Sequence, residues 1–432
     1  MKKVLIISPH LPPINAADMH RIRQSLPYFQ KLGWEPVVVT VDPRYVEIDH
    51  DPLLLDTVPN NIRVIVIKAL STRYTRKLGL GSLALRSIWF YYRRVNRLLK
   101  QQKFDLIYFS TTMFPLPILG RLWKRRFGVP YVIDMQDPWL SDYYLSKPKH
   151  ERPPKFWFSH RLNQLTEPFA MKKVDGVIAV SKAYTKILQD RYPNITTKKC
   201  LTLTFGAFDK DFEVLERNEI ANPFFNPNDN LIHIPYIGRA GHDMRFSLSG
   251  IFDTLKSGLE RKPELFSKVR LYFIGTSYAA EGKGTKTVAP LAQQYGLSKQ
   301  VIESTDRVPY FQALRLLKDA TMLLIPGSDD PKYTASKLYN YILVRKPLLA
   351  VFHEKSSVVK IINDTNAGRT VLISDHTESA QKDVSERIFR EWHDMLMHLP
   401  FVPETDWGAF RKYSAEQMTK EQVTHFEKIL QL

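Results

Sequence analysis

The sequence has a single cysteine, Cys200, among its 432 residues. One thiol excludes a disulfide bond within the chain and leaves a thiolate metal site without enough ligands. Long apolar runs are missing as well, since none reaches the roughly 18 residues of a membrane-spanning helix. The apolar run near the amino terminus, residues 4–7, is too short for the core of a signal peptide. These absences together predict a cytoplasmic protein.

Several metal and cofactor motifs are also absent. The 12 histidines show no H-E-x-x-H spacing, so no zinc site is predicted. The turn after the first predicted strand lacks the G-x-G-x-x-G pattern of dinucleotide-binding proteins and holds Asn15, Ala16 and Ala17 instead. The sequence therefore disfavours a dinucleotide-binding dehydrogenase, and we predict neither a bound metal nor a cofactor.

Acidic residues are scarce relative to basic ones. There are 44 Asp and Glu against 62 Lys and Arg, which gives a formal net charge of +18. Such a surplus favours a polyanionic partner, whether nucleic acid, an anionic membrane face or a phosphorylated ligand, while a merely solvated surface is the alternative. No nucleic-acid recognition motif accompanies the charge, so no specific nucleic-acid binding is predicted.

The residues that are present suffice for two hydrophobic cores, because 44% of them are hydrophobic and the chain is too long for one domain. Apolar strand patterns alternate with helical patterns on both sides of a polar segment. The predicted strands are residues 4–7, 36–41, 64–67, 106–110, 131–134, 176–180, 232–237, 270–274, 301–303, 322–326 and 347–351, and the predicted helices are residues 19–31, 82–101, 247–259, 288–295, 311–318 and 415–432.

This alternation predicts an α/β fold of two doubly wound, Rossmann-like domains that face a central cleft. We expect the first domain at residues 1–212, a linker at 213–230 and the second domain at 231–410. A helix in residues 411–432 ends the chain, and we expect it to cross back to the first domain.

Residues 321–351 form one strand, loop, helix and strand unit of the second domain. In an open parallel sheet, ligands bind outside the carboxyl ends of the strands. The loop and helix start at residues 327–337 therefore predict an anion site, because free backbone amides at a helix start attract negative charge. A purely structural βαβ unit is the alternative reading.

Two acids follow the predicted strand at residues 131–134. Asp134 and Asp137 lie three residues apart at the strand end, where they could bind sugar hydroxyls or act as a general base. Alternatively, Asp137 caps a helix in which Pro138 is the first residue. The two readings are compatible.

The predicted helix at residues 82–101 combines aromatic residues with arginines. This composition suits a helix that lies on anionic lipid headgroups. An ordinary packed helix with a charged outer face is an equal alternative.

The order of the motifs resembles the GT-B glycosyltransferases, in particular the family 4-like group of retaining enzymes that use nucleotide-sugar donors. The resemblance runs over nearly the whole chain. Its motifs are the Pro-rich turn at residues 9–17, DMQDPW at 134–139, VDGVIAVSKA at 174–183, FGAFDKDF at 205–212, YIG at 236–238, FIGT at 273–276 and SKLYNYILVRKPLLA at 336–350.

The resemblance implies that the second domain binds the donor and the first domain receives the acceptor. It assigns the chemistry to Asp137, supported by Asp134, and to the cations Arg239 and Lys337. Electrostatics also favours a role for these two cations, because a departing nucleoside diphosphate gains negative charge that they can stabilise. Further donor contacts are expected at Gly238, Arg245, Val308, Tyr310, Ser336, Tyr339 and Asn340, and acceptor-side contacts at Asn15, Ala16 and Arg21.

The sequence also departs from the family pattern. Many members carry a Glu-x7-Glu pair where this chain has Lys332 and Asn340. Asn15 and Ala16 replace glycines in the first turn, and Ser110, Thr111 and Thr112 stand where a histidine is common.

The resemblance implies a metal-independent, retaining enzyme that moves a hexose-type sugar to a glycan or lipid-linked glycan, such as a precursor of polysaccharide, capsule or lipopolysaccharide. The basic surplus favours peripheral contact with the anionic inner face of the cytoplasmic membrane. A sugar-nucleotide epimerase with the same fold and a non-catalytic scaffold are the alternatives.

Overall fold

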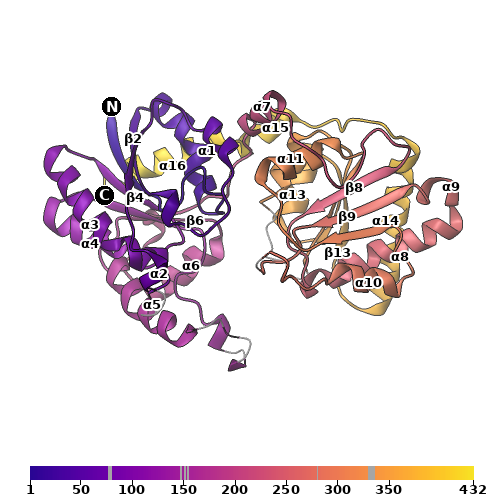
Figure 1. Ribbon diagram of the computed structural model, residues 1–432, viewed down its shortest axis with the longest axis horizontal. Helices are drawn as coiled ribbons and strands as arrows, with labels where there is room; N and C mark the ends of the chain where they lie inside the picture. Colours follow the sequence, from indigo (N-terminus) through magenta and orange to yellow (C-terminus); the bar gives the residue numbers. More distant parts are fainter. Residues whose placement is uncertain (76–79, 146–147, 150–151, 153–154, 280, 329–335) are drawn as a thin grey trace. The chain divides into compact units, whose positions relative to one another are not determined.

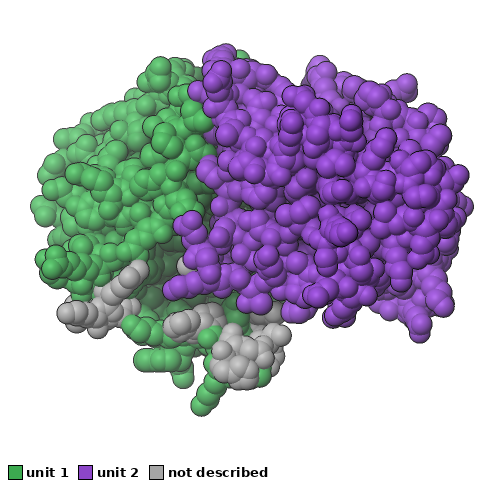
Figure 2. Space-filling view, turned by 45° about the vertical axis from the view of Figure 1, so that its right-hand side comes forward, with its two compact units in different colours: residues 1–206, 414–432 green, residues 207–413 purple. Residues whose placement is uncertain are grey.

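A computed structural model describes the chain except for residues 76–79, 146–147, 150–151, 153–154, 280 and 329–335 (Figure 1). The chain divides into two compact units, which Figure 2 shows in different colours. Unit 1 comprises Met1–Gly206 and Ser414–Leu432, and unit 2 comprises Ala207–Tyr413. Each unit has parallel strands connected by helices, so the predicted α/β fold with two Rossmann-like domains is confirmed.

Unit 1 is built on a seven-stranded parallel sheet with the order β3-β2-β1-β4-β5-β6-β7. The order reverses between β1 and β4, which makes the carboxyl ends of these two strands the switch point where ligands bind in such sheets. The strands are β1 (Lys2–Ile7), β2 (Trp34–Val41), β3 (Arg63–Ile67), β4 (Leu106–Ser110), β5 (Tyr131–Met135), β6 (Gly176–Ala179) and β7 (Cys200–Thr202).

Helices cover both faces of this sheet. Helices α3, α4 and α5 lie on one face, and α1 lies with α16 on the other (Figure 1), as expected for the right-handed crossovers typical of parallel sheets. The helices of unit 1 are α1 (Met19–Phe29), α2 (Thr72–Thr75), α3 (Leu83–Gln101), α4 (Ile118–Phe127), α5 (Phe156–Met171), α6 (Lys182–Arg191) and α16 (Ala415–Ile429). None of the helices described is long and apolar enough to cross a membrane.

The last helix, α16, returns to unit 1, as the sequence predicts. Its Phe426 ring lies 5.1 Å from the ring of Tyr108, 5.6 Å from that of Trp34 and 6.5 Å from that of Phe29. All four rings are buried. The burial of these four aromatic rings anchors α16 to the sheet of unit 1.

Unit 2 contains two three-stranded parallel sheets, with orders β10-β9-β8 and β11-β12-β13. The backbone amides of Thr321 and Met322, just before β11, donate to the carbonyl of His233 in β8, which joins the two sheets side by side. The second switch point therefore lies between β8 and β11. The strands are β8 (Ile232–Ile237), β9 (Val269–Ile274), β10 (Val301–Ser304), β11 (Leu323–Pro326), β12 (Leu348–His353) and β13 (Arg369–Ile373).

The helices of unit 2 are α7 (Lys210–Arg217), α8 (Arg245–Arg261), α9 (Pro263–Phe266), α10 (Val288–Gln294), α11 (Tyr310–Asp319), α12 (Leu338–Leu343), α13 (Ser357–Thr365), α14 (Glu378–Met397) and α15 (Trp407–Phe410). Short 3-10 turns occur at Gln30–Leu32, Pro43–Tyr45, Pro52–Thr57, Tyr143–Leu145, Thr197–Lys199, His242–Met244 and Arg411–Tyr413.

The structure differs from the sequence prediction at the connection between the units. The boundary lies at Gly206 and Ala207, and residues 213–230 belong to unit 2 instead of forming a separate linker. The reason is a buried aromatic side chain in this otherwise polar segment. Phe225 stacks 4.5 Å from the His233 ring and lies 5.0 Å from the Tyr272 ring.

Candidate functional site

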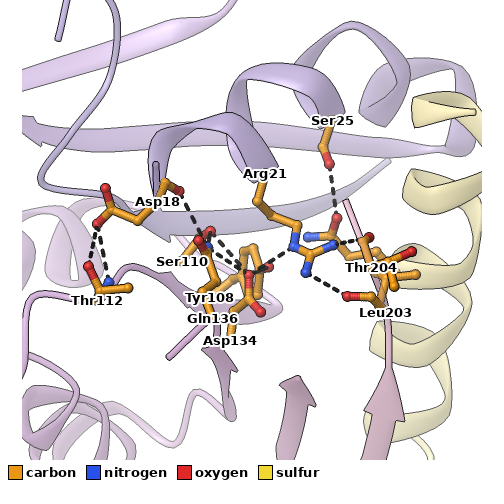
Figure 3. Close-up of polar contacts among 11 residues, drawn as sticks. Asp18, Arg21, Ser25, Tyr108, Ser110, Thr112, Asp134, Gln136, Leu203 and Thr204 are labelled. Carbon is orange, nitrogen blue, oxygen red and sulfur yellow. Dashed lines mark hydrogen bonds and ion pairs between the residues drawn. The ribbon is translucent and has the colours of Figure 1, made fainter. Parts of the chain in front are cut away.

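Asp18 joins three loops at the switch point of unit 1 (Figure 3). Its Oδ1 atom lies 2.7 Å from His10 Nδ1 in the loop after β1. Its Oδ2 atom accepts from the Thr112 amide and the Thr111 hydroxyl, both at 3.1 Å, in the loop after β4. The Gln136 side chain, after β5, donates to the Asp18 carbonyl at 3.3 Å.

These donors fix the charge of Asp18. Burial raises the pKa of the carboxyl, but the hydrogen bonds and charge of His10 and the donors at Thr111 and Thr112 together bring it below its ordinary value. A carboxylate with both oxygens occupied and a lowered pKa is a poor general base. Asp18 therefore acts as a fixed negative charge that holds the three loops together.

Arg21 and Asp134 form a buried ion pair beneath these loops (Figure 3). Arg21 Nε donates to Asp134 Oδ2 at 3.0 Å, and its two terminal nitrogens donate to the carbonyls of Leu203 and Thr204, both at 2.7 Å. Both side chains are fully buried. The same carboxylate oxygen accepts from Tyr108, Ser110 and Gln136. This geometry makes Asp134 and Arg21 supports of the site, because neither side chain reaches solvent.

Asp137 is exposed at the surface, unlike Asp134. No helix begins at Pro138, so Asp137 is not a helix cap. The loop is instead anchored by Trp139, whose indole donates to Asn163 of α5 at 3.2 Å and stacks 4.7 Å from Phe114.

The environment of Asp137 suits proton transfer. Partial burial of its carboxyl group and the nearby charge of Asp18 raise its pKa above the ordinary value. A raised pKa brings a carboxylate closer to the range in which it accepts a proton effectively. Two predicted acceptor-side residues, the partly exposed Asn15 and the buried Ala16, lie in the same loop as His10 and Asp18.

In unit 2, Lys337 lies against Gly238 at the carboxyl end of β8. Its ammonium group is 2.8 Å from the Tyr236 hydroxyl and 4.2 Å from the centre of that ring. A Cβ atom on Gly238 would lie 2.3 Å from the Lys337 Nζ atom, and Gly238 has a φ of 133°. Only glycine combines this backbone conformation with room for the ammonium group.

The pKa of Lys337 is close to neutral pH. Burial of the ammonium group, and then the charge of Arg239, lower the pKa of Lys337 to about 7. A cation held in this state gains from the approach of an anion, which favours its charged form.

Arg239 is aligned by Asp243. Its Nη1 and Nη2 atoms donate to the two carboxylate oxygens at 2.8 and 2.6 Å. Burial raises the pKa of Asp243, but the hydrogen bonds from Arg239 and Ser328 hold it below its ordinary value. The predicted donor contact Arg245 is exposed at the start of α8.

The remaining predicted donor contacts have different surroundings. Tyr310 donates to Asp211 Oδ2 at 2.5 Å, and the Asn340 side-chain amide lies 3.5 Å from the Tyr310 hydroxyl. Val308 packs against a small apolar cluster around Phe225.

Tyr339 faces the core, where it is 4% exposed and lies 6.0 Å from the Tyr413 ring, so its side chain does not face a ligand. Ser336 is exposed and precedes Lys337, which is the N-cap of α12 without a side-chain cap bond. Lys332 lies outside the described residues.

The structure thus brings Gly238, Arg239 and Lys337 together at one switch point and places Asp137 beside Asp18 at the other. The sequence prediction missed His10, Asp18, Tyr236 and Asp211. Asp18 had a local signal, because an acid directly before a predicted helix is typical of a helix start. His10, Asp211 and Tyr236 lie within the motifs at residues 9–17, 205–212 and 236–238, but nothing in those motifs singled them out. Within the described part of the chain, no three His, Cys, Asp or Glu side chains could hold a metal ion.

Comparisons with known proteins bear on the fold. Residues 20–195 match the family described as Glycosyl transferase 4-like domain. Among solved structures, HepE of Anabaena in complex with UDP shares 14% identity with a TM-score of 0.55, covering 98% of this chain and 99% of that one. Sucrose-phosphate synthase of Thermosynechococcus elongatus shares 12% identity with a TM-score of 0.57, covering 99% and 98%. No curated protein matches the sequence.

A third solved structure, TarM of S. aureus in complex with fondaparinux, α-GlcNAc-glycerol and UDP, shares 12% identity with a TM-score of 0.56, covering 99% of this chain and 100% of that one. The whole chain therefore has the fold of the GT-B glycosyltransferases. Residues 20–195 match a domain of the family 4-like group, and the whole chain has the corresponding fold, which agrees with the resemblance described from the sequence.

Proposed function

We propose that the protein moves a hexose-type sugar from a nucleotide diphosphate-sugar to a glycan or lipid-linked glycan, with retention of configuration and without a metal ion. Unit 2 binds the donor and unit 1 the acceptor. The observation that carries the proposal is the pair of cations, Arg239 and Lys337, around Gly238 at the carboxyl end of β8.

The cations supply what the departing nucleoside diphosphate requires. Its phosphate oxygens gain negative charge as the bond to the sugar breaks, and preorganised guanidinium and ammonium groups stabilise that charge. Asp243 aligns Arg239, and Tyr236 holds Lys337, so little reorganisation is needed. HepE, a protein of similar fold, has been solved with UDP-glucose, which supports a nucleotide-sugar donor.

The base and ribose of the donor bind on the Tyr310 and Asn340 side of the same unit. Asn340 has no charge, but its amide can hydrogen-bond a ribose hydroxyl. Asp211 contributes a carboxylate to this region through its bond to Tyr310.

Asp137 orients a hydroxyl group of the acceptor or the donor. It is the acid of the DMQDPW motif that solvent can reach, and its raised pKa suits exchange of a proton with a hydroxyl group. Asp18 and the Arg21–Asp134 pair hold the loops around it.

We favour lipid-linked precursors of polysaccharide, capsule or lipopolysaccharide as acceptors, at the inner face of the cytoplasmic membrane. The net charge of +18 supports an anionic surface as partner. Trp89 and Arg93 on the outside of α3, 5.9 Å apart from ring centre to guanidinium carbon, support a helix at the headgroup level.

The test is a screen of nucleotide-sugars with the purified protein, read as release of nucleoside diphosphate with and without a glycan acceptor. We expect turnover with one donor, retention of the anomeric configuration by NMR, and no loss of rate with a metal chelator. Lys337→Gln should abolish turnover, whereas Lys355→Gln, an exposed lysine of unit 2, should not. Binding of every donor class without turnover would support the scaffold alternative, and conversion of the donor sugar alone would support the epimerase.

A further inference from the structure

Three neighbouring helices of unit 1 carry many basic residues and almost no acidic ones. Lys and Arg number five in α3, four in α4 and one in α5. The one acid among these helices, Glu167, is buried and bonded to Arg191, Tyr192 and the amide of Leu140. Outside these helices, Asp175 pairs with Lys124 of α4, and the exposed Asp142 lies 3.9 Å from the buried His160 of α5. The charges on the helices themselves are nevertheless almost all basic, which is unusual for a surface whose only role is solubility.

Large apolar side chains stand on this basic layer. In α5, Leu165 is 74% and Trp157 is 72% exposed, and Phe158 and Phe169 are also exposed. Phe158, Leu165 and Phe169 are spaced by seven and four residues, so they form one stripe along the helix. The opposite side of α5 carries its buried residues, among them Ala170 and Met171, so the stripe faces away from the core.

The stripe continues onto the neighbouring helices. The Arg121 guanidinium of α4 lies 4.3 Å from the Phe169 ring centre and donates to the Phe169 carbonyl. On α4, Leu122 is exposed, with Arg125 one turn further on. On α3, Trp89 is 59% exposed. Apolar and basic groups thus alternate across α3, α4 and α5.

We propose that this outer face of α3, α4 and α5 docks on an anionic lipid bilayer. Leu165, Phe169 and Trp157 enter the boundary between headgroups and acyl chains, and basic side chains such as Arg125 and Arg161 bind the lipid phosphates. The proposal rests on the proposed function in one respect: a lipid-linked acceptor would explain why the enzyme lies on a membrane.

The chemistry of the surface distinguishes a bilayer from other polyanions. An exposed leucine and phenylalanine stripe gains nothing from a nucleic-acid backbone, whereas it gains free energy when it leaves water for the acyl boundary. A second copy of the same basic surface would bring like charges together. A bilayer with anionic headgroups satisfies both the apolar and the basic groups.

The experiment measures co-sedimentation of the full chain with vesicles of phosphatidylcholine alone and of phosphatidylcholine mixed with phosphatidylglycerol. We expect binding to the mixed vesicles, weakened by salt. Leu165→Gln and Phe169→Gln should each weaken it by about tenfold, from the transfer of one large apolar side chain. The control is Val402→Gln in unit 2, where the apolar Val402 side chain is 66% exposed, and this variant should bind as the unaltered protein does.

A charge series completes the test. Arg125→Gln with Arg161→Gln should reduce binding to the mixed vesicles and its salt dependence, whereas Lys268→Gln with Lys355→Gln, exposed lysines of unit 2, should change neither. Equal binding of all variants, or equal binding to both vesicle types, would overturn the proposal. So would a dimer in solution that Leu165→Gln dissociates.

The proposed function is tested separately by donor turnover in vesicle-free solution. Leu165→Gln and Phe169→Gln should leave that turnover unchanged. Vesicle binding by a protein that turns over no donor would refute the proposed function but leave the docking surface standing, and the reverse result would refute only the docking surface.

Discussion

Donor binding should be coupled to proton uptake at Lys337. The pKa of this lysine is about 7 because its ammonium group is buried beside the charge of Arg239. The diphosphate of a bound nucleotide-sugar favours the charged ammonium, which raises the pKa back towards 10.5. The protein must therefore bind a proton together with the donor whenever the pH is above 7.

The magnitude follows from the fraction of Lys337 that is already charged. This fraction falls from about one half at pH 7 to about 0.03 at pH 8.5 for a pKa of about 7. The apparent Kd of the donor should rise by roughly sixteenfold over this interval, which is about 1.6 kcal/mol. Arg239 and its partner Asp243 keep their charges over the same interval, because the pKa of Asp243 is lowered.

The assay is isothermal titration calorimetry with a nucleotide-sugar at several pH values, in two buffers that differ in ionisation enthalpy. We expect uptake of close to one proton at pH 8.5. Lys337→Gln should bind weakly and without pH dependence. Lys346→Gln is the matched control, because Lys346 also has a lowered pKa but lies before the amino end of β12, whereas Lys337 lies at the carboxyl end of β8.

The stability of the donor-free protein should also depend on the titration of Lys337. A lysine whose pKa is lowered on folding opposes folding most strongly below pH 7, and this cost declines as pH rises towards 10.5. The unaltered protein should therefore gain stability relative to Lys337→Gln as pH rises above 7. A donor affinity that stays constant from pH 7 to 8.5, or a slope that survives in Lys337→Gln, would refute the reasoning.

Three further substitutions have clear expected outcomes. Gly238→Ala should lower the free energy of unfolding by about 1–3 kcal/mol, because alanine is strained at a φ of 133°. It should also weaken donor binding, because the new Cβ atom displaces the Lys337 ammonium group. Thermal melts measure the first effect and calorimetry the second. Arg21→Met should lower the free energy of unfolding by about 3–5 kcal/mol, measured with denaturant, because it leaves the buried Asp134 without its ion-pair partner. Adding Asp134→Leu should restore much of this stability. A double variant as unstable as the single one would contradict the reasoning. Asp137→Asn should reduce kcat by about 10²-fold without lowering Tm, because the raised pKa shows that the carboxylate charge is disfavoured by folding; unchanged kcat would remove Asp137 from the chemistry.

The strands were the most predictable part of the fold. Parallel strands covered on both faces appear as short apolar runs, and the predicted strands at residues 106–110 and 131–134 correspond to β4 and β5. Helix α5 was not predicted, because its outer face carries Trp157 and Leu165 and so its pattern lacks a polar side.

The candidate site was predictable only where its residues adjoin a strand end. Gly238 and Asp137 follow such ends, and the sequence predicts both. Asp18 depends on partners 93 and 94 residues away, Thr111 and Thr112, which no local pattern reveals. Tyr339 was expected to contact the donor, but a six-residue helix such as α12 does not show in its sequence which face meets the core.

The return of α16 makes unit 2 an insertion within unit 1. A ribosome completes residues 207–413 before it produces the helix that covers Phe29, Trp34 and Tyr108. During synthesis, the second unit in the chain is thus the first to have all of its residues available for folding. In a fragment that ends at residue 206, the rings of Phe29, Trp34 and Tyr108 lose the cover of α16 and are exposed to water. A shortened version of the first unit should join residues 1–206 directly to residues 414–432.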